Sequence, residues 1–317
     1  MKIIFSLFLL VSGVNLFAAE TDDFTFRNEK LADMSGVINE KANLFLKEAV
    51  ELTNAQGSCD EKKLYSNLET YFANHTKGKL TQYILESDEV VKHVFPISES
   101  VYKEWSITDG FLLGRDKEAQ SALAFAPLVR IGEETIGSDK FEHMFGMGLD
   151  YFTAHYLKGK GMTRVLKSGA LEETVILGGT SLTTGIFAYG DLSANFNGMR
   201  FWNHVLQKKT DILGAHYNVG PFVKCEGTTF VTVRPIDFRN YVDASMNESV
   251  NCSHFATRAG LRKFKASLKR LGNLTCPLDP ELNREMQKKY AVPLKDSEKT
   301  ISDLIINTGS NTPIFFN

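Results

Sequence analysis

Apolar residues recur every three to four positions between residues 30 and 90, which is the spacing of amphipathic helices. The period is clear in MSGVINEKANLFLKEAVELTN and returns in KLYSNLETYFANH and LTQYILES. Residues 91–136 are less regular, and HVFPISESVYKEW and FAPLVRIGEE indicate extended segments or a short hairpin around a loop. We therefore predict helices up to residue 90 and mostly non-helical chain from there to residue 136.

The helical period returns after residue 137. A helix is predicted from residue 138 to 158, with Ser138 as its N-cap. A glycine-rich helix is predicted from residue 170 to 190, and a third helix follows it with Asp191 as N-cap. Glycines inside helices cost stability relative to alanine, so they indicate places where backbones or a ligand approach closely.

The last third of the chain adds a small amount of β-structure. Residues 221–238 alternate around a glycine turn, which predicts a β-hairpin, and residues 252–271 predict a late helix. The tail after Pro293 is predicted to be loop. The predicted fold class is therefore mainly α (α+β), a helical domain with a minor β-hairpin.

The first 18 residues have the layout of a secretory signal peptide. Lys2 precedes the apolar run IIFSLFLLVSGVNLFAA, which ends in Ala18 and Ala19, and acidic sequence begins at Glu20. The run is shorter than the ~20 residues of a spanning helix, and no later stretch is long and apolar enough to span. We predict cleavage after Ala18 and export to the periplasm or the medium, without a stable membrane anchor.

The rest of the chain is long enough for one large domain or two modest ones. We predict an N-terminal, mostly helical region over 19–125 and a catalytic core over 126–317, with one continuous domain over 19–317 as the alternative. The near-balanced charge, −2 with a pI of about 6.4, argues against a nucleic-acid partner. RKFKASLKR suits the solvated face of an amphipathic helix. A monomer is expected.

The four cysteines are widely spaced and form no CxxC pair, so a zinc ribbon is not indicated. In an exported protein, such cysteines are expected to form one or two disulfides. The spacing leaves three pairings open, with at least one bridge expected among the last three. The candidates are Cys59, Cys225, Cys252 and Cys276.

The stretch SDKFEHMFGMGLDYF places Glu142 and His143 on a predicted helix that is otherwise apolar. At about 100° per residue, Glu142 lies at the edge of the apolar face, and a carboxyl there is a candidate general acid. Asp139 lies one turn before His143, so these two side chains are predicted to pair. A backbone cap or an ion pair would explain a single Glu on a helix flank equally well.

A second group of polar and aromatic residues lies in YGDLSANFNGMRFWNH. Tyr189, Asp191 and Asn195 are predicted substrate contacts, because Asn and Asp can bind sugar hydroxyls and an aromatic face can stack on a sugar ring. Asp191 as a simple N-cap is the alternative. A third group, in NYVDASMNESVNCSHF, includes Asp243 and Glu248 and either lines the same cleft or forms a capped loop.

Other chemistries find less support in the sequence. The seven histidines form neither HExxH nor HxH, so no metal site is predicted, and no cofactor is expected. A G-x-S-x-G elbow is absent, which argues against a serine nucleophile. The glycine-rich stretches lack the lysine of a P-loop, which argues against nucleotide binding.

With SDKFEHMFG on one helix and YGDLSANFNG on a later one, the exported chain resembles the deacetylation-specific lysozymes of predatory bacteria. These proteins have a lysozyme-like fold related to goose-type lysozymes and lytic transglycosylases. The resemblance implies that Glu142 is the catalytic acid, with His143, Tyr189, Asp191, Asn195 and Asp243 as candidate substrate contacts. His143 follows Glu142 where the wider superfamily often has Ser, so the chain departs from the pattern at this point.

The resemblance implies a muramidase that cleaves the β-1,4 glycan backbone of peptidoglycan and prefers N-deacetylated strands. Protonated Glu142 would donate to the leaving glycosidic oxygen, either as a hydrolase or with an anhydro product as in lytic transglycosylases. Two alternatives stay open: a non-catalytic envelope protein that binds glycan or has a structural role, and a metal-dependent envelope hydrolase.

Overall fold

Three helices near the N-terminus form one side of the molecule: α1 (Ser35–Ala55), α2 (Glu61–Phe72) and α3 (Lys79–Glu86). The computed structural model describes residues 19–309 apart from 56, 74–77, 119–124 and 308. Each helix buries one apolar stripe, as the spacing of its hydrophobic residues predicts. Asp60 caps α2 by accepting from the amides of Lys62 and Lys63.

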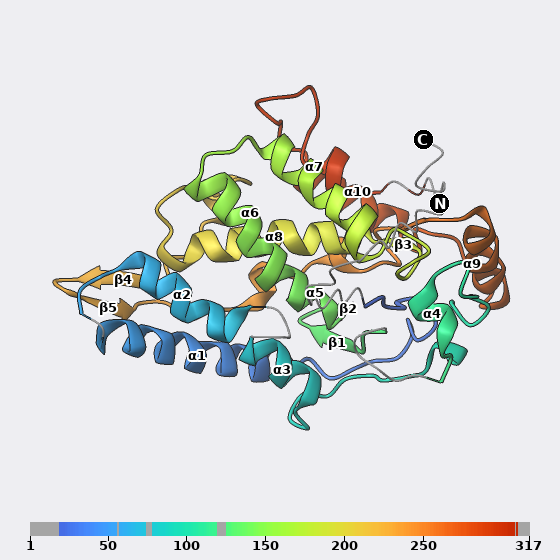
Figure 1. Cartoon of the computed structure of the whole chain (residues 1–317), viewed down its shortest axis with the longest axis horizontal. Coiled ribbons are helices and arrows are strands. Elements are labelled where there is room, and N and C mark those ends of the chain that lie inside the picture. Colours follow the sequence, from blue (N-terminus) through green and yellow to red (C-terminus); the bar gives the residue numbers. More distant parts are fainter. Residues whose placement is uncertain (1–18, 56, 74–77, 119–124, 308, 310–317) are drawn as a thin grey trace, which may run out of the picture.

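Helix α8 (Tyr189–Leu206) runs through the middle of the molecule (Figure 1). Every residue between its two ends is buried, so it has no solvated face. Its backbone lies very close to the preceding helical run, because a Cβ atom built on Gly198 would lie 2.0 Å from the Met144 carbonyl oxygen. Gly198 of α8 and Gly148 of the preceding run therefore allow the two backbones to approach closely.

The helix predicted over 138–158 is confirmed, but two π-turns interrupt its α-helical geometry. It consists of α5 (Asp139–Glu142), the π-turn η2 (His143–Met147), α6 (Gly148–Phe152) and the π-turn η3 (Thr153–Leu157). Ser138 lies at the predicted N-cap position, but its side chain makes no capping hydrogen bond. Single π-turns inside helices occur often at functional sites, and His143 begins the first one.

The glycine-rich helix predicted over 170–190 is wrong in its bounds. Helix α7 (Met162–Glu172) begins earlier and continues through the π-turn η4 (Glu173–Leu177). Gly178 ends the helical run, and Gly185 has a φ of +79°, which a larger side chain rarely adopts. Strand β3 (Ile186–Phe187) then pairs with β6 (His254–Phe255).

The sheets of the described residues are antiparallel and two-stranded, and isolated bridges such as the parallel one between Glu20 and Phe125 lie outside them. Strands β1 (Leu128–Ile131) and β2 (Glu134–Gly137) form one hairpin, and β4 (Val223–Glu226) and β5 (Thr229–Thr232) form the predicted one. The chain thus has the mainly helical architecture with a minor β-hairpin that its sequence predicts. The remaining helices are α4 (Phe111–Arg115), α9 (Arg258–Arg270), α10 (Pro280–Lys289) and α11 (Ser302–Ile305).

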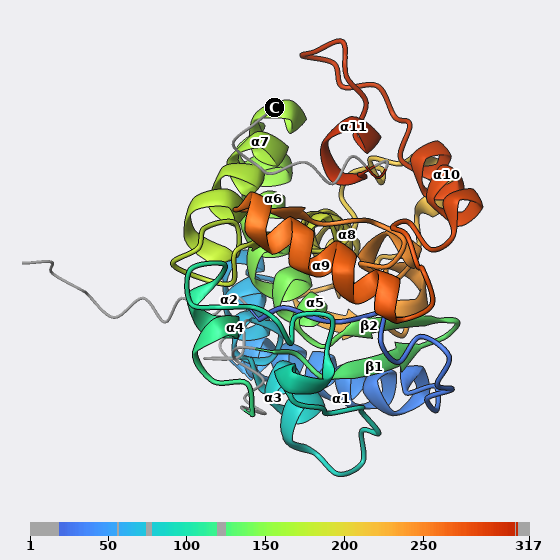
Figure 2. The same cartoon turned by 90° about the vertical axis from the view of Figure 1, so that its right-hand side faces the viewer.

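The largest apolar core joins side chains from both halves of the chain. It includes residues of α1–α3 together with residues of α5–α8 and α11. A smaller core contains Trp105 and Phe255 and is covered by α9, which crosses the side of the molecule seen in Figure 2. Helix α10 was not predicted, and α11 lies within the tail predicted to be loop.

Two disulfides fasten distant parts of the chain. Cys59 is bonded to Cys225, and Cys252 is bonded to Cys276. The predicted signal peptide, residues 1–18, lies outside the described residues, and none of the helices within them is long and apolar enough to cross a membrane. Disulfides persist in oxidising compartments, so they fit an exported protein.

We expect the Cys59–Cys225 disulfide to stabilise the fold more than Cys252–Cys276, because it closes a segment of 166 residues rather than 24. Replacing both cysteines of a pair by Ser should lower the free energy of unfolding by about 2–5 kcal/mol. Urea unfolding of the two double variants measures the difference. An equal or larger loss for the 252–276 pair would contradict the expectation.

Candidate functional site

Lys140 is the centre of a buried polar cluster. Its Nζ atom donates to Asp139 Oδ2 at 2.7 Å, to Asp191 Oδ1 at 2.6 Å and to Glu248 Oε1 at 2.9 Å. The lysine is completely buried, and the three carboxylates are at most 4% exposed. Helices α5 and α8 and the loop before β6 each supply part of this arrangement, so the cluster forms only in the folded chain.

Two acidic residues from the start of the described chain extend the cluster. Asp23 accepts a hydrogen bond from the Glu248 amide at 2.7 Å, and Glu20 accepts one from the Thr184 hydroxyl at 2.5 Å. Glu173, in the π-turn after α7, is fully buried and interacts electrostatically with Asp191 and His143. The cluster thus contains six buried carboxyl groups: Glu20, Asp23, Asp139, Glu173, Asp191 and Glu248.

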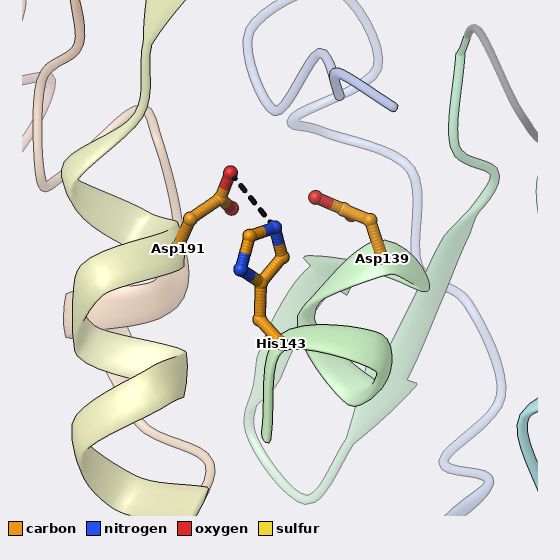
Figure 3. Close-up of side chains that lie close together, drawn as sticks. All are labelled: Asp139, His143 and Asp191. Atoms are coloured by element: carbon orange, nitrogen blue, oxygen red, sulfur yellow. Dashed lines mark ion pairs between the residues drawn. The ribbon is translucent and has the colours of Figure 1, made fainter. Parts of the chain in front are cut away.

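The imidazole of His143 is held from both sides, and Figure 3 shows its pairing with Asp191. Its Nε2 atom lies 3.2 Å from Asp191 Oδ2, and its Nδ1 atom lies 3.0 Å from the Asn195 side chain. The Asn195 amide can present its oxygen to a protonated Nδ1 or, after rotation, its nitrogen to an unprotonated one at the same distance. Asn195 can therefore satisfy His143 in both protonation states.

The surroundings of His143 and Glu173 raise the pKa values of both side chains. Burial would lower the pKa of His143, but the adjacent Asp191 raises it to about 9. Burial raises the pKa of Glu173 to about 8, and repulsion from Asp191 adds to the shift. Burial would also raise the pKa of Asp191, but His143 and Lys140 outweigh it and keep this carboxyl ionised. The six carboxyls outnumber the two basic groups, so some of them remain protonated.

The cluster includes three side chains with the chemistry of metal ligands. One ligating atom each of Asp139, His143 and Asp191 lies within 4.8 Å of the others. The Lys140 ammonium already contacts both aspartates, however, and a divalent cation at this position would be repelled by it. We therefore assign the role of the cation in this cluster to Lys140.

The predicted site residues do not all lie together in the fold. His143, Asp191 and Asn195 lie together in the cluster, and half-buried Glu142 directly precedes His143 at the end of α5. Asp191 is not the N-cap, because α8 begins at Tyr189 and Asp191 falls in its first turn, where it can reach Lys140. The predicted Asp139–His143 pair is also wrong, since Asp139 bonds to Lys140 and His143 pairs with Asp191.

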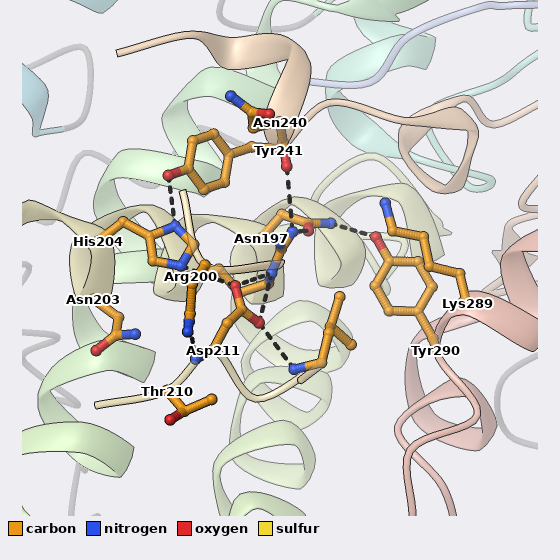
Figure 4. A network of polar contacts seen from close by, with 12 residues as sticks. Asn197, Arg200, Asn203, His204, Thr210, Asp211, Asn240, Tyr241, Lys289 and Tyr290 are labelled. Carbon is orange, nitrogen blue, oxygen red and sulfur yellow. Dashed lines mark hydrogen bonds and ion pairs between the residues drawn. The ribbon is translucent and has the colours of Figure 1, made fainter. Parts of the chain in front are cut away.

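Tyr189 and Asp243 lie outside the Lys140 contacts. The Tyr189 ring packs against Phe187 and His254. Asp243 accepts a hydrogen bond from the Tyr290 hydroxyl at 2.6 Å and pairs with Lys289. Tyr290 and Lys289 belong to a second polar network, which is drawn in Figure 4.

The centre of this second network is Arg200, which lies near the C-terminal end of α8. Arg200 donates to Asp211 at 2.9 Å and to Asn197 at 2.6 Å, and Asn197 donates to the Tyr290 hydroxyl at 2.8 Å. His204 lies between Asp211 and the Tyr241 hydroxyl. Because each of these groups has a partner within the protein, we interpret this network as structural.

Four members of the cluster are not predicted from the sequence: Lys140, Glu173, Glu20 and Asp23. The signal for Lys140 is present, because a lysine between Asp139 and Phe141 on an apolar helix must be either exposed or paired. No local signal identifies Glu20 or Asp23, since their partners lie more than 150 positions away.

No protein-family model, curated protein or solved structure matches this chain.

We expect Lys140→Met to destabilise the protein strongly, because it leaves three buried carboxylates without their shared cation. Removing one partner of a buried ion pair typically costs about 3–5 kcal/mol. Urea unfolding at neutral pH measures the loss, with Lys47→Met as the control, since Lys47 is exposed and pairs only with Glu51 on the same helix. A loss no larger than that of the control would contradict the central role of Lys140.

The pH dependence of stability provides a second test, directed at Glu173. Its raised pKa means that the folded state binds a proton more tightly than the unfolded chain, so stability falls as pH rises from about 4.5 to about 8. Glu173→Gln should make this fall less steep. Urea unfolding at several pH values measures the slope, with the exposed Glu133→Gln as control. A slope equal to that of the unmodified protein would show that Glu173 does not hold this proton.

Proposed function

We propose that this chain is an exported glycosidase that cleaves the β-1,4 backbone of peptidoglycan, in the periplasm or after secretion. The two disulfides support export. The substrate class rests on the resemblance of SDKFEHMFG and YGDLSANFNG to the lysozymes of predatory bacteria, and N-deacetylated strands are the expected preference. Both stretches contribute to the cluster around His143, which is where we place the reaction.

The observation that carries the proposal is the fixed, partnered imidazole of His143 beside a carboxyl that reaches the surface. His143 is held by Asp191 and Asn195, whereas the adjacent Glu142 is only half-buried. A substrate can therefore contact Glu142 without any opening of the cluster. Groups that act on a glycosidic bond must touch it, so the fully buried Glu173 is a less suitable donor.

Glycosidic hydrolysis needs a proton for the leaving oxygen and stabilisation of an oxocarbenium-like transition state. We assign the proton donation to Glu142. The ionised Asp191 pairs with His143, the residue that directly follows Glu142 in the chain. Water then adds its hydroxyl to the anomeric carbon, and its remaining proton restores the acid. Lys140 keeps Asp191 in place and ionised throughout.

Digestion of purified sacculi tests the proposal. We expect the mature protein to release soluble muropeptides, faster from N-deacetylated than from intact wall, and Glu142→Gln to lower the rate at least about 100-fold. Glu133→Gln is the matched control, because Glu133 is an exposed glutamate in the β1–β2 turn.

Three outcomes would contradict this function or its assigned donor. If the mature protein released nothing from either wall, the chain would be a glycan-binding or structural protein of the envelope. If Glu142→Gln kept the full rate while Glu173→Gln lost it, the proton donor would be the buried glutamate instead. Loss of activity on addition of a chelator would return the reaction to metal chemistry at Asp139, His143 and Asp191.

A further inference from the structure

A cavity of about 300 Å³ opens between the helical run that ends at residue 158 and α7. The two helical segments lie side by side (Figure 1). Cavities of this size are typical of sites for small molecules. Its floor is formed by the buried residues Tyr151, Val165 and Gly169, and its rim is formed by charged side chains.

The floor of this cavity connects directly to the cluster around His143. A Cβ atom built on Gly169 would lie 1.5 Å from the Tyr151 hydroxyl, so only glycine leaves room for this ring. Burial raises the pKa of Tyr151, and the nearby Asn195 side chain opposes the shift. Because Asn195 also contacts His143, a single residue separates the cavity floor from the imidazole.

The rim carries charges of both signs. Lys158, Lys160 and Arg164 line the cavity, and within the described parts of the chain none of them forms a salt bridge. Asp150 and Glu172 also line it. Burial raises the pKa of Glu172, and repulsion from Asp150 adds to the shift, which places the two carboxyls near each other. The cavity therefore presents unpaired cations together with two adjacent carboxyls.

We propose that this cavity binds a small zwitterion, which is an amino acid or a short peptide with both ends free. The carboxylate of the ligand would contact Lys158, Lys160 and Arg164, and its ammonium group would contact Asp150 and Glu172. Such a ligand offers a charge complementary to each set of side chains, which neither a simple anion nor a simple cation does, and its ammonium group reduces the repulsion between Asp150 and Glu172. Arg164 can hold a carboxylate through two parallel hydrogen bonds.

The binding itself is independent of glycan cleavage. Its role as a subsite for the peptide that is attached to the glycan strand rests on the proposed function. In that role, the cavity would hold the part of the peptide that carries a free ammonium group and a free carboxylate. The sugar backbone would lie near Glu142. Tyr151 lines the cavity, and Asn195 contacts His143, so a bound ligand would change the surroundings of the imidazole.

Calorimetric titration of the mature protein with alanylalanine tests the proposal. We expect saturable binding, and at least about tenfold weaker binding of N-acetyl-alanylalanine and of alanylalanine amide, each of which lacks one charge. Arg164→Gln and Asp150→Asn should each weaken binding of alanylalanine at least about tenfold. Both residues are exposed, so these variants are expected to fold.

Lys167→Gln is the matched control, because Lys167 is an exposed cation of α7 that does not line the cavity. Absence of saturable binding, or equal affinity in both cavity variants and the control, would overturn the proposal. Glu142→Gln should bind alanylalanine with unchanged affinity. A protein that binds the dipeptide but digests no sacculi would leave this site standing and remove the proposed function, and the reverse result would do the opposite.

Discussion

The ammonium group of Lys140 is the constraint on which the rest of the site depends. A buried ammonium is tolerated only when carboxylates surround it at hydrogen-bond distance, and here three of them come from separate parts of the chain. Two of these carboxylates have a further task. Asp191 holds His143, and Glu248 is linked through its amide to Asp23 near the start of the described chain. One side chain thus ties the segments around residues 23 and 248 to the central helix.

The excess of carboxyls over basic groups explains the proton content of the cluster. Burial raises the pKa values of Glu173 and Glu248, and Lys140 and His143 balance only part of the negative charge that six ionised carboxyls would carry. Such a cluster stores protons near neutral pH inside the protein. This property makes stability fall as pH rises.

Helix α8 organises both polar networks. Its first half supplies Asp191 and Asn195 to the cluster, and its second half supplies Asn197 and Arg200 to the structural network. A helix that is buried all round is normally apolar, so its many polar residues require partners on every side. Tyr151 lines the cavity between the run ending at residue 158 and α7. Asn195 lies between this residue and His143 of the first network.

The sequence alone determined the mainly helical class, the hairpin within residues 221–238, and His143, Asp191 and Asn195 as candidate polar residues on predicted helices. These features follow from periodicity and residue type, which are local. It could not determine the end of α7, because Gly178 and Gly185 act through contacts with distant backbone. Nor could it show that Lys140 gathers Asp139, Asp191 and Glu248, since only tertiary packing brings residues 108 positions apart to 2.9 Å.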